Sequence, residues 1–425
     1  MARAAMRGES RVLAELAASL IRPERDNLVE RPWGGEAIRR FKRIPADARG
    51  AAMPWGEAFE ISAFNGDLEA KRFPSRVRFD DGSAVELPGL LEAQGERLLG
   101  EPFLARYGAC FPLLPKTLSV KELLSVQGHP EGHTEVYIII DAEPGATLRV
   151  GFNRDIDGAD LTQRLVRGIE QQYQLQATFG ADSDARELQS AVAPWFADRN
   201  APLAALESWL GEKIGLDSAR GNAIALLVEL KTLYWHVLDS MNAIEVEPGQ
   251  VIYNATPARL LTETGGTATA EVHALGNPDG KEILALEIRR PGPTFRAWDN
   301  VRFPQREVDV AGAIAALNLR ATRPEEFICE LVPLPGCAGA RVSVDCEFFR
   351  VVHLAPDAGQ PVSLPAAGPH ALHCLAGAVE VLGADGRMIG RLESGESALV
   401  PVGVGAYRVE AATLADVVRV TLPED

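Results

Sequence analysis

The segment Leu124–Tyr137, LSVQGHPEGHTEVY, concentrates side chains of the kinds that bind metals. Successive side chains of a β-strand point to opposite faces, so Ser125, Gln127 and His129 are expected to project from the same face. The Pro-Glu-Gly turn that follows lets the chain reverse, and Glu135 then returns on the neighbouring strand. One amide oxygen, one imidazole and one carboxylate suit a catalytic zinc ion with an open coordination position. The spacing alone also fits a polar strand end that carries a surface histidine.

A second imidazole would complete such a site, and the chain has seven histidines. His236 lies in a helical pattern and is expected to be structural. His373, in HALHCLAG, has no acidic residue at a suitable spacing. His273, in AEVHALGN, precedes a strand that we assign to the same barrel as Gln127, so it is the preferred fourth ligand.

The elements that must position these residues are strands, interrupted by one block of helices. Residues 50–155 alternate short apolar runs with Gly, Pro and Asp, which is typical of a β-sandwich or barrel. From residue 158 to residue 242, apolar residues recur three and four positions apart and predict helices. Strand patterns return after Ala243 and again in 343–425. In both regions Gly and Pro recur at intervals between short strands, a pattern that is common in jelly-roll barrels.

The predicted fold is therefore mainly β with a helical insertion, namely two jelly-roll β-barrels plus an α-helical domain. The catalytic barrel is expected to be formed by two stretches of chain, 22–157 and 243–305, with the helical insertion at 158–242 between them. Residues 306–425 are expected to form a C-terminal jelly-roll barrel. No metal-ligand set is evident in 343–425, so this second barrel is expected to be structural.

Composition excludes several classes of partner. The 425 residues are 46% hydrophobic and 24% charged, as in a soluble globular protein, and the length predicts two or three domains. A formal charge of −16 disfavours binding to nucleic acid or to anionic membranes. No stretch resembles a membrane span, and the first twenty-one residues fit an amphipathic helix better than a secretion signal, so we expect a cytoplasmic protein. Five cysteines without a CxxC pair indicate reduced thiols and no zinc–thiolate site.

The order of several short motifs resembles that of the type I phosphomannose isomerases. These motifs are RPWGG from Arg31, GEAFEIS from Gly56, FPLLPK from Phe111, LSVQGHP from Leu124, HTE from His133 and DAEPG from Asp141. Farther along, EVEPGQVIYNATP, VHALGN and TFRAWDN resemble the family's second-barrel strand, its histidine element and its arginine segment. The resemblance covers residues 31–155 and 243–310, and it implies cupin-type barrels.

The resemblance implies one zinc ion per chain, held by Gln127, His129, Glu135 and His273. It also implies that Arg296, Glu57 and Lys116 are catalytic and that Ser125, Lys116 and Arg296 hold the substrate. The expected reaction interconverts mannose 6-phosphate and fructose 6-phosphate through a cis-enediol. Zinc would act as a Lewis acid and Arg296 would stabilise the developing negative charge, while Glu57 and Lys116 are candidate bases.

Two departures from the family's pattern leave the substrate open. His133 stands where relatives often carry a lysine that helps hold the phosphate, so it is a candidate substrate-binding residue with a changed role. The stretch between His129 and Glu135 is also short. An isomerase of a related sugar and a non-catalytic cupin-type sugar-binding or regulatory protein are therefore the alternatives. The sequence does not indicate an oligomeric state.

Overall fold

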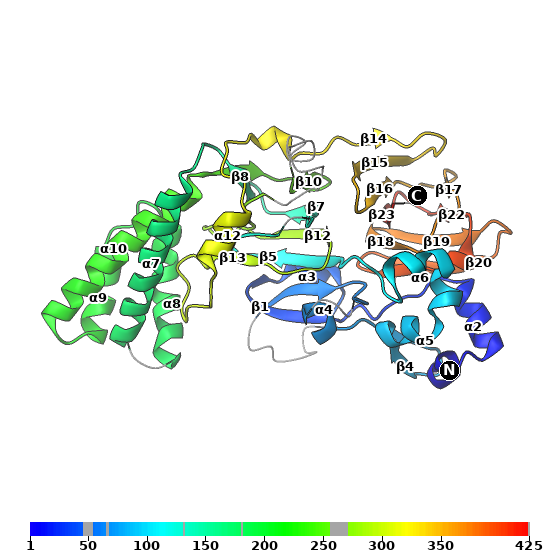
Figure 1. Cartoon of the computed structure of the whole chain (residues 1–425), viewed down its shortest axis with the longest axis horizontal. Coiled ribbons are helices and arrows are strands. Elements are labelled where there is room, and N and C mark those ends of the chain that lie inside the picture. Colours follow the sequence, from blue (N-terminus) through cyan, green and yellow to red (C-terminus); the bar gives the residue numbers. More distant parts are fainter. Residues whose placement is uncertain (46–53, 65–67, 131, 180–181, 256–270, 424–425) are drawn as a thin grey trace.

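The computed structural model describes residues 1–45, 54–64, 68–130, 132–179, 182–255 and 271–423. A helical block lies at one end of the long axis and β-sheets lie in the middle (Figure 1). A second group of sheets, with the N-terminal helices, occupies the other end. Every pairing between the named strands in the described part of the chain is antiparallel. The fold is thus mixed α/β, with several antiparallel sheets and a helical region, as the strand–helix–strand pattern predicts in outline.

Two sheets form the middle of the molecule. The six-stranded sheet consists, in spatial order, of β1 (Leu28–Gly35), β2 (Trp55–Phe59), β5 (Lys116–Val120), β12 (Ile283–Arg289), β7 (Glu135–Ala142) and β10 (Val251–Tyr253). The five-stranded sheet consists of β13 (Phe295–Trp298), β6 (Val126–Gly128), β11 (His273–Ala274), β8 (Thr147–Phe152) and β9 (Met241–Glu245). Each sheet therefore combines strands from both sides of the helical block.

One hydrophobic cluster joins these two sheets. It contains Tyr137 and Ile139 from β7 together with Leu148 and Val150 from β8, all buried. In each pair the residues are two positions apart, which is the period that a strand needs to turn both side chains to one face. Burial of this shared face against the other sheet positions β6, β7 and β11 next to one another.

The helical block is formed by four helices, as the periodicity from residue 158 predicts: α7 (Gly158–Phe179), α8 (Asp182–Ala197), α9 (Ala204–Lys213) and α10 (Asp217–Leu238). Their apolar faces share a cluster with the five-stranded sheet and with α12 (Val310–Ala316). The buried indole of Trp298 in β13 donates a hydrogen bond to Gln172 of α7 at 3.0 Å, so a polar contact also joins sheet and helices.

The C-terminal region contains two further sheets around their own core. The first consists of β14 (Val332–Pro333), β15 (Ala340–Asp345), β16 (Arg350–Leu354), β23 (Asp416–Thr421), β18 (His370–Ala376) and β21 (Ser397–Val400). The second consists of β17 (Val362–Leu364), β22 (Tyr407–Glu410), β19 (Ala378–Gly383) and β20 (Met388–Glu393). Short 3₁₀ helices lie at η1 (Pro324–Glu326) and η2 (Val402–Val404).

Helices near the N-terminus depart from the β-rich pattern assigned to residues 50–155. The remaining elements before β5 are α1 (Ala2–Met6), α2 (Ser10–Ala17), α3 (Ala37–Phe41), α4 (Leu68–Arg72), the hairpin of β3 (Arg76–Arg78) and β4 (Ala84–Glu86), α5 (Leu87–Leu99) and α6 (Glu101–Tyr107). The prediction was wrong for α5 and α6. Pro88 and Gly89 resemble a turn, but proline is compatible with the first turn of a helix. Leu87, Leu90, Leu91 and Leu98 are all buried, at spacings close to whole helical turns.

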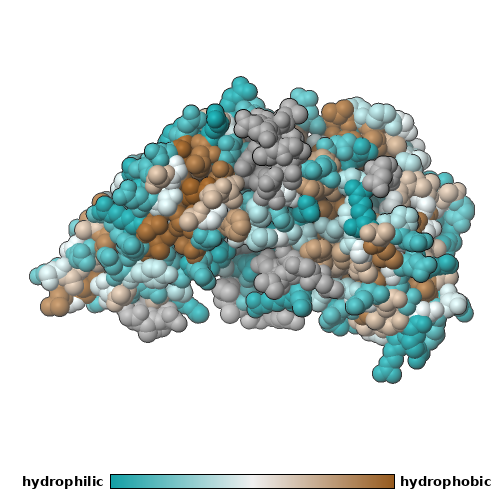
Figure 2. Space-filling model, in the orientation of Figure 1, coloured by the Kyte–Doolittle hydropathy of each residue, from teal (hydrophilic) through white to brown (hydrophobic). Residues whose placement is uncertain are grey.

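The surface is mixed in character. On the face in Figure 2, hydrophobic residues gather over the helical end, and much of the remainder is hydrophilic. Exposed apolar side chains of α7 and α10 include Val166, Tyr173 and Val228. Among the described residues, no helix combines the length and the apolarity needed to cross a membrane. All five cysteines are free thiols.

Candidate metal centre

Neighbouring strands bring the predicted metal ligands together. Gln127 in β6 lies directly opposite His273 in β11 and, on its other side, opposite Arg296 in β13. His129 follows the end of β6, and Glu135 begins β7. Opposed residues of antiparallel strands have Cβ atoms about 5 Å apart, so the register brings these side chains within mutual reach. Strand pairing thus unites residues that are 146 positions apart in the sequence.

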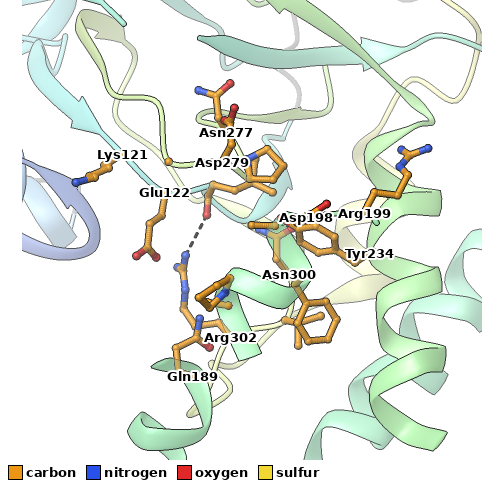
Figure 3. A pocket seen from close by; sticks show the side chains of 18 residues that line it. Lys121, Glu122, Gln189, Asp198, Arg199, Tyr234, Asn277, Asp279, Asn300 and Arg302 are labelled. Atoms are coloured by element: carbon orange, nitrogen blue, oxygen red, sulfur yellow. Dashed lines mark hydrogen bonds between the residues drawn. The ribbon is translucent and has the colours of Figure 1, made fainter. Parts of the chain in front are cut away.

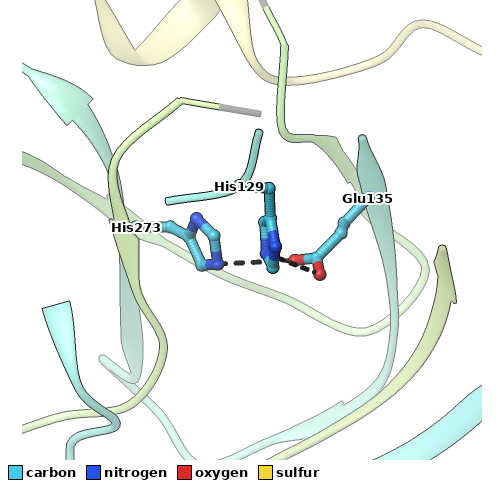
Figure 4. A group of neighbouring side chains, drawn as sticks. All are labelled: His129, Glu135 and His273. Atoms are coloured by element: carbon cyan, nitrogen blue, oxygen red, sulfur yellow. Dashed lines mark ion pairs between the residues drawn. The ribbon is translucent and has the colours of Figure 1, made fainter. Parts of the chain in front are cut away.

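The side chains of His129, Glu135 and His273 converge on one buried point (Figure 4). One ligand atom from each lies within 4.8 Å of the other two. Nε2 of His129 is 2.9 Å from Oε1 of Glu135, and Nε2 of His273 is 3.4 Å from Oε2 of Glu135. Two ligands bound at about 2.1 Å to a tetrahedral ion lie about 3.4 Å apart, so this spacing fits a small divalent cation.

Backbone carbonyls set the tautomers of both histidines. Nδ1 of His129 lies 3.1 Å from the carbonyl oxygen of Pro293. Nδ1 of His273 lies 2.9 Å from the carbonyl oxygen of Glu271, and it is equally close to the amide of Asn254. A carbonyl oxygen only accepts, so each ring carries its proton on Nδ1 and presents a lone pair on Nε2. Metal-binding histidines are oriented in this way in proteins generally.

The same tautomers leave two acceptors facing each other. Nε2 of His129 and Oε1 of Glu135 are buried, and among the described residues neither has a hydrogen-bond partner. Two lone-pair atoms 2.9 Å apart with no proton between them repel unless a cation lies beside both. The donor set, two imidazoles and a carboxylate, is one that zinc accepts. These residues therefore fit a resident metal ion.

Gln127 is adjacent to this cluster. Its Nε2 lies 2.9 Å from Nε2 of His273, and its Oε1 accepts a hydrogen bond from Ser125 at 3.0 Å. A half-turn of the amide exchanges the two ends, after which Oε1 faces the cluster and Nε2 can donate to the Ser125 hydroxyl. Ser125 accommodates both orientations because a hydroxyl donates and accepts.

The electrostatics of the cluster favour a charged Glu135 and neutral imidazole at His273. Burial acts to raise the pKa of Glu135, but the adjacent His129 imidazole, the Arg289 guanidinium and the His273 imidazole hold that pKa well below its usual range. Burial lowers the pKa of His273 to about 4, against the opposing effect of Glu135. The Tyr137 hydroxyl donates to the second oxygen of Glu135. Deprotonated ligands are the form that binds a metal.

A cavity of 110 Å³ lies beside Gln127, and its walls are strongly charged. Among the described residues it is lined by five basic side chains and two acidic ones, namely Arg31, Lys116, Arg289, Arg296, Arg306, Glu57 and Glu287. Ser125 also lines it, so the predicted residues Ser125, Lys116, Arg296 and Glu57 all share one cavity. Glu57 pairs with Arg31 at 2.8 Å, and the Lys116 ammonium lies 3.9 Å from the same carboxylate oxygen.

His133 lies elsewhere. Its ring packs against Gly292, where an added Cβ atom would be only 1.9 Å from Cε1 of the imidazole. It does not line the cavity beside Gln127. Burial, together with the charges of His129, Arg290 and Arg289, lowers its pKa to about 4, so the ring is neutral at physiological pH.

The structure adds four charged cavity residues that were not predicted as site residues, Arg31, Arg306, Glu287 and Arg289, and the last two lie on one strand. Glu287 and Arg289 are two positions apart in β12, and both line the cavity although they are only 6% and 7% exposed. Burial and the nearby charge of Glu135 raise the pKa of Glu287 to about 8. The sequence did contain one indication of these residues. In ILALEIR, two charged residues interrupt an otherwise apolar run that forms a buried strand.

A larger cavity, of 660 Å³, lies between α8, α10 and the chain segment that leads into β6 (Figure 3). Its walls carry charges of both signs, and none of the metal-binding side chains lines it. Arg302 donates to the carbonyl oxygen of Leu123 at 3.0 Å, and Asn300 donates to that of Leu124 at 2.6 Å. These contacts fix the segment immediately before Ser125.

No protein-family model matches the chain, and no curated protein sequence matches it either. Solved structures do match. Mannose 6-phosphate isomerase from Bacillus subtilis aligns with a TM-score of 0.58 and 18% identity, over 95% of this chain and 100% of that one. A point mutant of phosphomannose isomerase from Salmonella typhimurium aligns with a TM-score of 0.58 and 16% identity, over 96% and 99%. A mannose 6-phosphate isomerase bound with zinc and yttrium gives the same four values. Along nearly its whole length, this chain therefore has the fold of the type I phosphomannose isomerases.

Proposed function

We propose that the chain is a zinc-dependent aldose–ketose isomerase that interconverts mannose 6-phosphate and fructose 6-phosphate. One observation carries the proposal. The lone pairs of His129, Glu135 and His273 meet at one buried point, next to a cavity whose charged side chains are mostly basic. The phosphomannose isomerase fold and the zinc in one structural neighbour support the same assignment. Gln127 is the fourth proposed ligand.

The proposal extends to the layout of the chain. The two central sheets, joined through a shared core, would form one cupin-type jelly-roll barrel from residues 22–157 and 243–305. The sheets around the C-terminal core would form the second barrel, within 306–425. Residues 158–242 would be the helical insertion.

The chain's own residues have distinct roles in this reaction. When bound, zinc supplies a Lewis acid that polarises the sugar oxygens at C1 and C2. Arg296, directly opposite the ligand Gln127, would stabilise negative charge as the cis-enediolate forms. Lys116 and Ser125 would hold the phosphate by hydrogen bonds, of which those from a cation are the stronger.

Glu287 is the better candidate for the group that moves the proton between C1 and C2. It is buried in the wall of the cavity, and its raised pKa, about 8, lies close to physiological pH, as general acid–base catalysis requires. Glu57, by contrast, accepts from Arg31 at 2.8 Å, and Lys116 lies beside it. We therefore assign Glu57 to orienting these two cations, with Lys116 in substrate binding.

A second candidate function is the isomerisation of an unphosphorylated sugar. It is favoured by the ion pairs of the cavity's cations: Arg31 with Glu57, Arg289 with Glu135 at 3.4 Å, and Arg306 with Asp299. A phosphate would have to compete with these carboxylates. His133, which stands in place of the family's lysine, packs outside the cavity.

Metal content and a coupled assay test the proposal. The purified protein should hold about one zinc per chain, as expected for a single four-ligand site, and His129→Ala should lose it. His236→Ala removes an exposed imidazole on α10 and is the matched control that should keep the metal. Conversion of mannose 6-phosphate is then followed by a coupled enzymatic assay for fructose 6-phosphate.

The outcomes separate the candidate functions. Activity on mannose but not on its phosphate would favour the second candidate. A metal-loaded chain without isomerase activity on either sugar would point to a sugar-binding or regulatory protein. A chain without metal, or one that retains it in His129→Ala, would refute the metal centre itself.

A further inference from the structure

The turn of residues 290–293, between β12 and β13, lies against the metal cluster. Its last carbonyl oxygen, that of Pro293, is 3.1 Å from Nδ1 of His129. This contact holds the His129 ring with Nε2 aimed at the cluster. The position of one backbone oxygen in the turn therefore determines how a metal ligand is presented.

Arg289, the last residue of β12, contacts both this turn and a metal ligand. Its Nη2 donates to the carbonyl oxygen of Gly292 at 2.7 Å, and its Nε donates to that of Arg290 at 3.3 Å. Its Nη1 lies 3.4 Å from Oε1 of Glu135. The guanidinium is planar and rigid, so three contacts made by its separate nitrogens fix the turn and the carboxylate relative to each other. The residue is only 7% exposed, which protects these contacts from water.

The opposite side of the turn is also held. The His133 ring fills the space beside Gly292, and Arg290 donates to the carbonyl oxygen of Gly132 at 2.9 Å. Movement of the turn away from Arg289 would push it into the chain segment that leads to Glu135. Loss of the guanidinium therefore has no simple compensation by a shift of the backbone.

We propose that Arg289 is a positioning residue of the metal centre, which sets Glu135 directly and His129 through the carbonyl groups of the 290–293 turn. The inference rests on the proposed metal site but not on the sugar that the site acts on. It predicts that Arg289 governs metal affinity and coordination geometry. A role in holding substrate alone would leave both unchanged.

The test compares variants of the full chain in binding zinc and cobalt(II), without substrate. Arg289→Met removes the guanidinium and keeps an apolar stem, whereas Arg289→Lys keeps the charge but not the planar fork. Arg419→Met is the matched control, because Arg419 is another buried arginine, 4% exposed, that donates to a backbone carbonyl in the C-terminal region. Zinc affinity is measured by competition with a chelator, and cobalt geometry is read from its visible absorption spectrum.

We expect Arg289→Met to weaken zinc binding by about 10- to 100-fold, the usual effect of removing a group that orients metal ligands. The cobalt spectrum should change in parallel. The zinc affinity of Arg289→Lys should lie between that of Arg289→Met and that of the unmodified chain, because one ammonium cannot make all three contacts. Arg419→Met should bind zinc as tightly as the unmodified chain.

Wild-type zinc affinity and an unchanged cobalt spectrum in folded Arg289→Met would overturn the proposal. If circular dichroism shows that Arg289→Met does not fold, Arg289→Lys decides, and wild-type affinity in that variant would be equally fatal. If the unmodified chain binds neither metal, the proposed metal centre fails instead, which is a separate result.

Discussion

Lys42 and Glu60 form a buried ion pair where the central and C-terminal sheets meet, and Lys42→Met tests what that pair contributes. The two residues are 1% and 5% exposed. Besides its ion pair with Lys42, Glu60 accepts hydrogen bonds from the hydroxyls of Thr117 and Ser397, and Lys42 donates to the carbonyl oxygen of Gly395 at 2.8 Å. Removal of one partner of a buried pair costs about 3–5 kcal/mol, because the other charge is left uncompensated. For Lys42→Met we expect the free energy of unfolding to fall by about 3 kcal/mol, the lower end of this range, because the hydroxyls of Thr117 and Ser397 still donate to the Glu60 carboxylate.

Urea unfolding followed by tryptophan fluorescence measures this loss. The double variant Lys42→Met/Glu60→Leu should recover most of the stability, because a buried ion pair is often replaceable by apolar side chains of similar volume. Arg167→Met is the control, since Arg167 pairs with Glu229 on the surface and should change stability by less than about 1 kcal/mol. A single variant as stable as the unmodified chain, or a double variant no better than the single, would refute the reasoning.

The pH dependence of unfolding in Lys42→Met gives a further prediction, because the pKa of Glu60 determines whether acid narrows or widens the stability difference from the unmodified chain. Burial acts to raise the pKa of Glu60, but Lys42, His373 and the hydrogen bonds from Lys42 and Thr117 bring it below its ordinary value of 4.5. A carboxyl whose pKa is lowered by folding stabilises above its unfolded pKa, and that contribution is lost as the pH falls through the folded pKa. Without Lys42 the burial effect dominates and the sign reverses. The stability gap between the two chains should therefore narrow on acidification, first above about pH 4.5 as Glu60 of the variant takes up its proton, and then below it as the unmodified chain loses its contribution.

Three further predictions concern the site. Glu287→Gln should lower kcat for mannose 6-phosphate by about 10²- to 10⁴-fold, the usual contribution of a general base, with zinc content by mass spectrometry unchanged. Asn254→Leu should weaken zinc binding about tenfold in a chelator competition, because it removes one of two groups beside Nδ1 of His273, and equal affinity would contradict this role. Glu57→Gln should lower KM for the phosphate about threefold by releasing the cations beside it, whereas a collapse of kcat would assign proton transfer to Glu57 instead.

Local sequence was sufficient to place Ser125 beside Gln127 in the predicted metal-binding segment, and to predict helices after residue 158. In the first case the alternation of a strand fixes which side chains share a face, and Ser125 and Gln127 are within hydrogen-bond distance. In the second, helices of up to 22 residues contain enough turns for apolar spacings of three and four positions to be recognised. The leucine-rich helix at Leu87–Leu99 was missed because its proline and glycines mark turns as readily as they tolerate a helix start.

Residues whose roles arise from strand pairing were not predictable in the same way. Glu287 faces the cavity because β12 lies between β5 and β7, which places it opposite Lys116 and Tyr137. Arg289 contacts Glu135 for the same reason, since the register pairs these two residues directly. Sequence spacing carries no information about such a register over more than a hundred residues. Within β12 itself, the one feature that points to a site is the presence of charged residues in an otherwise apolar strand.

The charges of the cavity favour an anionic substrate over a neutral sugar. The chain as a whole carries −16, yet basic side chains outnumber acidic ones around the cavity beside Gln127. Three of these cations already form ion pairs, Arg31 with Glu57, Arg289 with Glu135 and Arg306 with Asp299, and a phosphate would have to compete with those carboxylates. A neutral sugar offers these cations no countercharge. A sugar phosphate does offer a countercharge. The existing ion pairs therefore weaken phosphate binding, but the excess of basic side chains around the cavity still favours it.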